Sequence, residues 1–176
     1  MSGEPANAGR SGSDGGTGPV HHLNLRVGAA STDANGRPTL CLEAAPPWIL
    51  SVEGCGTGQG FLHDEAGREL AHFRAKLAFD LGESEGEALR LRVGLGFAEL
   101  QIGDDDPGFV FSRADPVETA GPEAPLSLQG LLALGRGFEL VANLVAGLAL
   151  LPRAGTLRVP QSEWQPFAGI EVGAGF

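Results

Sequence analysis

The sequence has no tyrosine, only two cysteines and no glycosylation sequon. Two cysteines, Cys41 and Cys55, cannot form the disulfide framework of a small secreted domain, so we predict two buried thiols. The first residues provide neither the basic nor the apolar part of a secretory signal. We therefore expect a cytoplasmic location by default, although a mature chain whose signal had been removed would look the same.

Motifs that bind nucleotides or metals are missing as well. The glycine-rich segment 54–60 lacks the G-x-G-x-x-G spacing and the lysine of a phosphate loop, and a strand pattern follows it. The histidines and cysteines show no spacing typical of zinc sites, and the acidic run 104–106 lacks the other ligands of a calcium loop. Cys55, His63 and Asp64 are adjacent in sequence, which does not establish catalytic geometry. We predict no catalytic residue, no metal and no cofactor.

Positive charge is scarce. The chain has 12 Lys and Arg against 22 Asp and Glu, which gives a net charge of −10 and a pI near 4.7. Because such a molecule repels polyanions at long range, we expect no nucleic-acid partner. The 28 glycines and 12 prolines favour many turns over long helices.

The chain length of 176 residues suits one domain, or one domain with a tail. Residues 1–19 contain no Val, Ile, Leu or aromatic side chain. A Gly- and Ser-rich segment of this kind cannot offset the entropy that it would lose on ordering. We predict that 1–19 is a disordered tail and that 20–176 is a single β-rich domain.

The clearest pattern is the alternation between residues 68 and 102, which predicts a long β-hairpin. Apolar residues occupy every second position on both sides of the polar loop 82–87, as in strands with one buried face. The predicted core-facing residues are Ala71, Phe73, Ala75, Leu77, Phe79 and Leu81 on the first strand and Leu89, Leu91, Val93, Leu95 and Phe97 on the second. Shorter strands are expected at 23–27, 39–44, 48–53, 61–64, 109–111, 156–159 and 170–172.

The face of this hairpin opposite the predicted core carries a group of basic residues. They are His72, Arg74, Lys76, Arg90 and Arg92. Basic groups on neighbouring strands predict a site for a phosphate, a carboxylate or an acidic protein surface. The alternative is a solvated sheet face whose charges are balanced by nearby acidic residues.

The most apolar stretch, 126–151, is predicted to form an amphipathic helix. Six apolar residues recur at alternating spacings of three and four: Leu131, Leu134, Phe138, Val141, Val145 and Leu148. Because the apolar arc covers more than half of such a helix, we expect it to mediate self-association; the alternative is a core helix that closes the sheet. A β-hairpin with its turn at 135–137 remains an alternative to the helix. A membrane-spanning helix is disfavoured, because Arg136 or Glu139 would each cost up to about 3 kcal/mol in hydrocarbon.

These patterns predict a mainly β fold, either an antiparallel β-sandwich or a half-open barrel of about eight or nine strands, with one long apolar helix in the C-terminal third. The predicted function is a non-enzymatic binding or assembly module. It would form a homo-oligomer through 126–151 and engage an acidic protein or an anionic small molecule through the basic face. The first alternative is a carrier of a small apolar ligand between sheet and helix. The second is an enzyme that uses Cys55 or a histidine.

Overall fold

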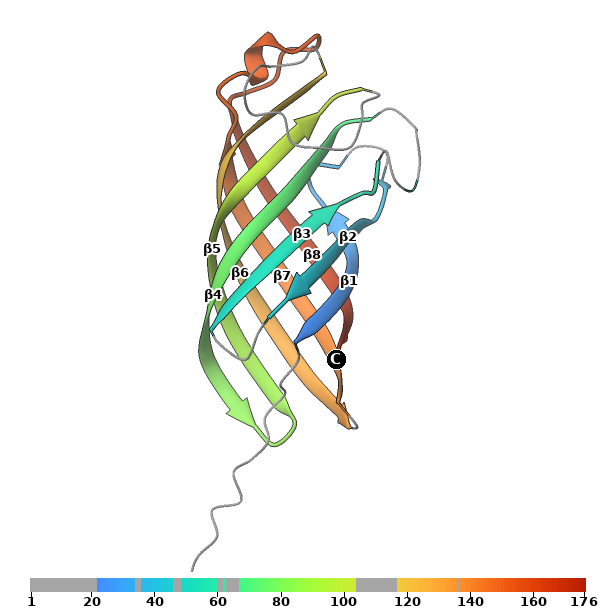
Figure 1. Ribbon diagram of the computed structural model, residues 1–176, viewed down its shortest axis with the longest axis vertical. Helices are drawn as coiled ribbons and strands as arrows, with labels where there is room; N and C mark the ends of the chain where they lie inside the picture. Colours follow the sequence, from blue (N-terminus) through green and yellow to red (C-terminus); the bar gives the residue numbers. More distant parts are fainter. Residues whose placement is uncertain are drawn as a thin grey trace, which may run out of the picture.

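Eight antiparallel strands close into a barrel in the computed structural model of the chain (Figure 1). The structure describes residues 22–33, 36–45, 49–59, 62, 67–103, 117–135 and 137–176. Within these residues the strands are β1 (Leu23–Ala30), β2 (Thr39–Ala44), β3 (Leu50–Gly56), β4 (Glu69–Ser84), β5 (Glu87–Gln101), β6 (Glu118–Gly135), β7 (Phe138–Leu150) and β8 (Trp164–Gly175). Each strand pairs with its neighbours in the chain, and β8 closes the barrel by pairing with β1.

The mainly β class is confirmed, but the predicted sandwich or half-open barrel with a long helix is wrong. Segment 126–151 forms the second half of β6, a tight turn and β7, as in the hairpin alternative. Gly135 and Gly137 have φ angles of 86° and 81°, a left-handed backbone that glycine adopts without strain. The two strands then pair from Gly135 opposite Phe138 up to Glu123 opposite Ala149.

Smaller differences concern the expected short elements. The strand predicted at 156–159 does not form; the 3-10 turn η2 (Ala154–Thr156) and irregular backbone take its place. Residues 170–172 belong to the longer β8. No helix in the described part of the chain is long and apolar enough to cross a membrane. The predicted tail 1–19 and the predicted strand 109–111 lie outside the described residues.

The connections between strands differ in length at the two ends of the barrel. Because neighbouring strands are antiparallel, successive connections alternate between the ends. The strand ends on either side of 31–38, 57–68, 102–117 and 151–163 lie at one end, which we call the loop end. The strand ends on either side of the shorter intervals 45–49, 85–86 and 136–137 lie at the other end, together with the C-terminus, and we call this the turn end (Figure 1).

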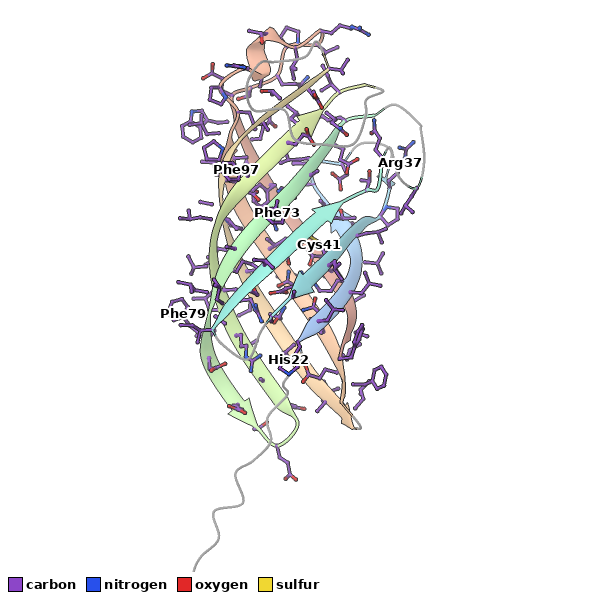
Figure 2. The ribbon with its side chains drawn as sticks, viewed as in Figure 1. His22, Arg37, Cys41, Phe73, Phe79 and Phe97 are labelled. Carbon is purple, nitrogen blue, oxygen red and sulfur yellow. A yellow bond between two sulfur atoms is a disulfide. The ribbon has the colours of Figure 1, made fainter. Side chains whose placement is uncertain are left out.

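The barrel wall turns apolar side chains outward and polar side chains inward. On β4, Phe73 and Phe79 are 55% and 51% exposed, and Figure 2 shows Phe79 pointing away from the barrel. Arg74 and Lys76 alternate with them on the same strand and are at most 2% exposed. The strand pairing expected for 68–102 is present, but the two faces are exchanged: the side predicted to form the core is the outer surface.

Two apolar clusters occupy the interior, one toward each end. The larger cluster lies near the loop end and consists of Leu70, Ala98, Leu100, Val145, Ala149, Leu151, Ala154, Leu157 and Phe167. The smaller cluster lies near the turn end and consists of Ala88, Leu131 and Val141. The middle of the interior therefore lies between these two apolar clusters.

Candidate functional site in the barrel interior

Charged side chains from seven strands meet in the middle of the interior. Successive side chains of a strand alternate between its faces, so one phase of each strand points inward. The inward positions hold Arg26 (β1), Glu43 (β2), Glu53 (β3), Arg74 and Lys76 (β4), Arg92 (β5), Glu123 (β6) and Glu171 (β8), all at most 4% exposed. We call these residues the charge network. Four are basic and four are acidic, so their charges balance.

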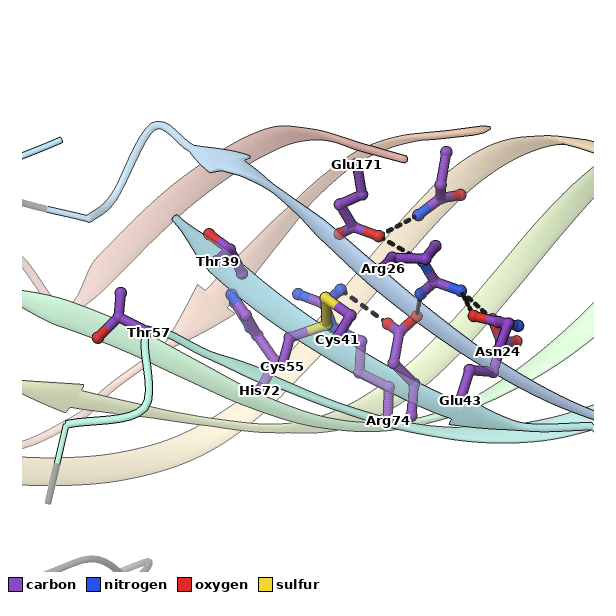
Figure 3. Close-up of a disulfide and its surroundings, with 12 residues drawn as sticks. Asn24, Arg26, Thr39, Cys41, Glu43, Cys55, Thr57, His72, Arg74 and Glu171 are labelled. Carbon is purple, nitrogen blue, oxygen red and sulfur yellow. Dashed lines mark hydrogen bonds and ion pairs between the residues drawn. A yellow bond between two sulfur atoms is a disulfide. The ribbon is translucent and has the colours of Figure 1, made fainter. Parts of the chain in front are cut away.

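Arg26 lies at the centre of the charge network (Figure 3). Its Nε donates to Glu171 Oε2 at 2.8 Å, and its Nη1 donates to Glu43 Oε2 at 2.6 Å. Its Nη2 donates to Glu53, and Nη1 also donates to the side-chain oxygen of Asn24. One guanidinium thus joins β1 to β2, β3 and β8 through charge-assisted hydrogen bonds.

The other basic groups share the same carboxylates. Lys76 Nζ lies 2.5 Å from Glu53 Oε2 and 3.4 Å from Glu43 Oε1. Arg92 Nη1 donates to Glu43 Oε1 at 2.5 Å, and Arg74 Nη1 donates to Glu53 Oε1 at 3.2 Å. Glu43 and Glu53 therefore each pair with three cations. This pairing compensates the several kcal/mol that burial of each unpaired charge would cost.

A side branch connects the charge network to the larger apolar cluster. His72 Nδ1 lies 2.7 Å from Glu123 Oε2, and Arg74 Nε donates to Glu123 Oε1 at 2.9 Å. The ring of Phe167 lies against both basic groups, 4.7 Å from the imidazole centroid and 4.9 Å from Arg74 Cζ. The second contact has the geometry of a cation–π interaction. The polar and apolar layers of the interior therefore contact each other directly.

Cys41 and Cys55 form a disulfide bond in this interior, so the prediction of two buried thiols is wrong (Figure 3). The two residues lie directly opposite each other in the pairing of β2 with β3, a relation that only strand register creates. A disulfide provides no thiolate, which removes Cys55 as a nucleophile. A carboxylate oxygen of Glu171 lies within 4.8 Å of both sulfur atoms, yet bonded sulfurs do not supply the thiolates of a metal site.

We expect the denatured chain to resist alkylation by maleimide until a reductant is added. Both sulfur atoms are bonded to each other, so no thiolate is available to react. Intact-mass spectrometry before and after reduction measures the number of adducts. The variant Cys41→Ser is the control, because its single thiol should react without reductant. Labelling of the unreduced wild-type chain would contradict the disulfide.

The residues predicted to bind an anion do not share an exposed face. Four of them, His72, Arg74, Lys76 and Arg92, are buried in the interior against glutamates. The fifth, Arg90, lies nearer the turn end, where its Nε donates to Asp80 Oδ1 at 2.8 Å and its side chain is 20% exposed. An external anion would have to compete with carboxylates that are already in place.

The six residues predicted to mediate self-association are divided between the two faces of the wall. Leu131, Val141 and Val145 point inward and are at most 9% exposed. Leu134, Phe138 and Leu148 point outward and are 41–65% exposed. The reason is geometric: a step of four residues keeps the same face of a strand, whereas a step of three changes it. No single surface therefore contains all six.

Sequence reasoning missed Arg26 and all four acidic members of the charge network. The sequence did contain a sign of the charge network, because polar residues occupy every second position on several strands, as Asn24 and Arg26 do on β1. The same alternation is typical of a sheet with one side in water. The pattern therefore located the polar face and could not show that it points inward.

The outer surface of the barrel is apolar around its circumference. The exposed large apolar side chains have exposed fractions from 37% at Leu128 to 72% at Leu95. At mid-height, strand pairing aligns an outward row that consists of Leu91, Leu128, Leu144 and Ile170. The barrel thus combines a charged centre with an apolar exterior.

Comparisons of the chain with family models, curated proteins and solved structures find no match.

Proposed function

We propose that this chain is a membrane protein whose barrel spans a lipid bilayer and holds its long connections on one side. The observation that carries the proposal is the exchange of faces, with apolar side chains outside and charges inside. Soluble monomers rarely expose contiguous apolar patches above a few hundred Å². A bilayer removes the cost of this band, about 25 cal/mol per Å² of apolar surface kept in water. An apolar outer band around a polar interior is typical of outer-membrane barrels.

The backbone supports the same placement. Each strand pairs with a neighbour on both sides, and β8 returns to β1, so the sheet closes into a ring. Hydrocarbon offers no hydrogen bonds to peptide groups, and a closed barrel satisfies them within the wall. An even number of antiparallel strands, short turns at one end and longer connections at the other are typical of outer-membrane barrels.

The interior supports an anchor rather than an open channel. The charge network lies between two apolar clusters, so side chains occupy the lumen at three levels. The cavity bordered by Thr39, His72, Arg74 and Phe167 has a volume of about 10 Å³, roughly the space of one water molecule. We propose that the barrel holds the loop end at the membrane surface as a binding platform.

The disulfide supports a location other than the expected cytoplasmic one. Disulfides persist in oxidising compartments and are rare in the cytosol. The bond between Cys41 and Cys55 lies in the barrel interior, where it staples β2 to β3. We propose that the protein folds in an oxidising compartment, such as the periplasm that adjoins a bacterial outer membrane.

This proposal takes the place of the functions expected from the sequence. The self-associating helix over 126–151 is absent, and its six residues are divided between two faces. A carrier of an apolar ligand would need an apolar chamber, whereas the centre of this barrel holds eight charged residues. We keep the predicted binding role for the protein, but we assign it to the loop end instead of the basic hairpin face.

The proposal is tested by diluting the urea-denatured chain into phospholipid vesicles that contain brominated acyl chains. The variant Trp48→Phe leaves Trp164, which is 55% exposed on the outer wall of β8, as the single tryptophan. We expect the bromines to quench its fluorescence and the strands to become resistant to added protease. Vesicles without bromine are the control. A chain that stays unquenched and monodisperse in lipid-free buffer would overturn the proposal.

A further inference from the structure

The outer wall has a groove of about 640 Å³ over β1 to β5, bordered at the loop end by Gly58, Gln59 and Leu62. Its apolar sides come from Leu25, Leu40 and Leu42, and its floor comes from residues without large side chains, Gly54, Gly56 and Ala71. The end nearest the loops is polar and includes Glu69, Glu99 and Gln101. The groove is thus apolar toward the middle of the barrel and acidic toward the loop end.

The depth of the groove follows from strand register. Leu25 pairs with Leu42, Leu42 with Gly54, and Gly54 with Phe73, so these outward positions form one row across four strands. In this row glycine interrupts a run of large apolar side chains. A Cβ built on Gly54 would meet no atom within 4 Å, which leaves the space above the backbone open. The missing side chain therefore creates a slot among bulky neighbours.

The side chains at the polar end of the groove are buried, and one of them is held by hydrogen bonds. Glu69, Glu99 and Gln101 are 4%, 3% and 5% exposed although they belong to the outward phase of β4 and β5. Glu69 is held in place by Thr57, whose backbone N–H donates to Glu69 Oε1 at 2.5 Å and whose hydroxyl donates to Oε2. The Gln101 side chain lines the groove beside these carboxylates, and it makes no hydrogen bond within the described part of the chain.

We propose that this groove binds a phospholipid with a primary-amine headgroup. The ammonium donates to the carboxylates of Glu69 and Glu99, the Gln101 amide donates to the phosphate, and one acyl chain lies over Gly54 between Leu25 and Leu42. Two acidic groups on neighbouring strands favour a cationic group over a purely anionic headgroup. The inference rests on the proposed function, because the loop end of a spanning barrel lies at headgroup level and the apolar floor lies at acyl-chain level.

Native mass spectrometry of the chain in micelles of an uncharged detergent tests the proposal. The probes are phosphatidylethanolamine and phosphatidylglycerol with identical acyl chains, added at equal concentration. We expect about tenfold more of the ethanolamine lipid to be retained, which corresponds to about 1.4 kcal/mol. Glu99→Gln should remove most of that preference. Gly54→Leu should reduce retention of both lipids, because its side chain fills the slot.

Matched controls separate the groove from the rest of the surface. Glu87→Gln changes an exposed acid at the turn end, and Gly130→Leu adds a side chain at another outward glycine, where a Cβ would also meet no atom within 4 Å. Neither should change the preference. Equal retention of both lipids, unchanged retention in Glu99→Gln, or a dimer mass lost on Gly54→Leu would overturn the proposal. A chain that fails the vesicle test instead refutes the spanning barrel itself, so the two failures are distinct.

Discussion

Replacing Arg26 with methionine is expected to lower the free energy of unfolding by about 3–5 kcal/mol, the cost of breaking a buried ion pair from one side. The change leaves Glu43, Glu53 and Glu171 in the interior without their shared partner. The remaining cations already pair with these or other carboxylates and cannot replace a guanidinium that reaches three strands at once. Urea unfolding in vesicles, followed by tryptophan fluorescence, measures the loss as a lower midpoint.

The control is Arg90→Met, which removes the same chemical group from a more open position. Arg90 pairs with Asp80, whose side chain is 61% exposed. Ion pairs of this kind contribute about 1 kcal/mol or less. If the two variants lost equal stability, the charge network would not be what holds the interior together.

Replacing Leu144 with arginine is expected to destabilise the inserted barrel by about 2–4 kcal/mol, the cost of a charge on the lipid face near the bilayer midplane. Leu144 is 53% exposed and lies halfway along β7, opposite Leu128 and Ile170. In a water-soluble barrel the same exposed position would tolerate arginine with almost no change. Unfolding of the vesicle-inserted variant measures the difference.

Leu134→Arg provides the control for depth. Leu134 is 65% exposed on the outer face, but it lies next to the turn end of β6, where the cost of a charge falls to about 0–1 kcal/mol. The identical substitution at two heights thus separates the effect of hydrocarbon from that of lost leucine packing. Equal losses at both positions would argue against a bilayer around the barrel.

The alternation of Phe73, Arg74, Ala75, Lys76 and Leu77 was sufficient to predict a long strand with one polar and one apolar face. It could not identify the solvent on either side, because a strand between water and core has the same period as one between hydrocarbon and a polar lumen. The secondary structure was therefore accessible from the sequence and the orientation of its faces was not.

The helix predicted over 126–151 was wrong for a related reason. Leu131 and Val141 lie inside the barrel near the turn end, and the outward side of the same strands is also apolar. A strand that is apolar on both faces has no period of two, and its run of leucine and valine fits a helix equally well. Only Gly135 and Gly137 marked the turn, and glycine is also tolerated in helices at a cost of about 1 kcal/mol.

The members of the charge network could not be grouped from the sequence. Arg26 and Glu171 are 145 positions apart, and they meet only because β8 returns to pair with β1. Cys41 and Cys55 are separated by 14 positions, and nothing in their spacing places them directly opposite each other. Both relations depend on register, which is set when the strands pair.

The contact of Arg26 with Glu171 also bears on the order in which the barrel forms. Glu43 and Glu53 reach Arg26 through β2 and β3, which follow β1 directly in the chain, so these contacts close early. The partner on β8 is near the end of the chain, so this contact belongs to the slowest class of events, the closure of long-range pairings. Until it forms, β1 and β8 are open edges that can pair with another chain. The hydrogen bonds between β1 and β8 form only when the ring is complete, so they stabilise the closed barrel and none of its incomplete forms. Closure is therefore cooperative.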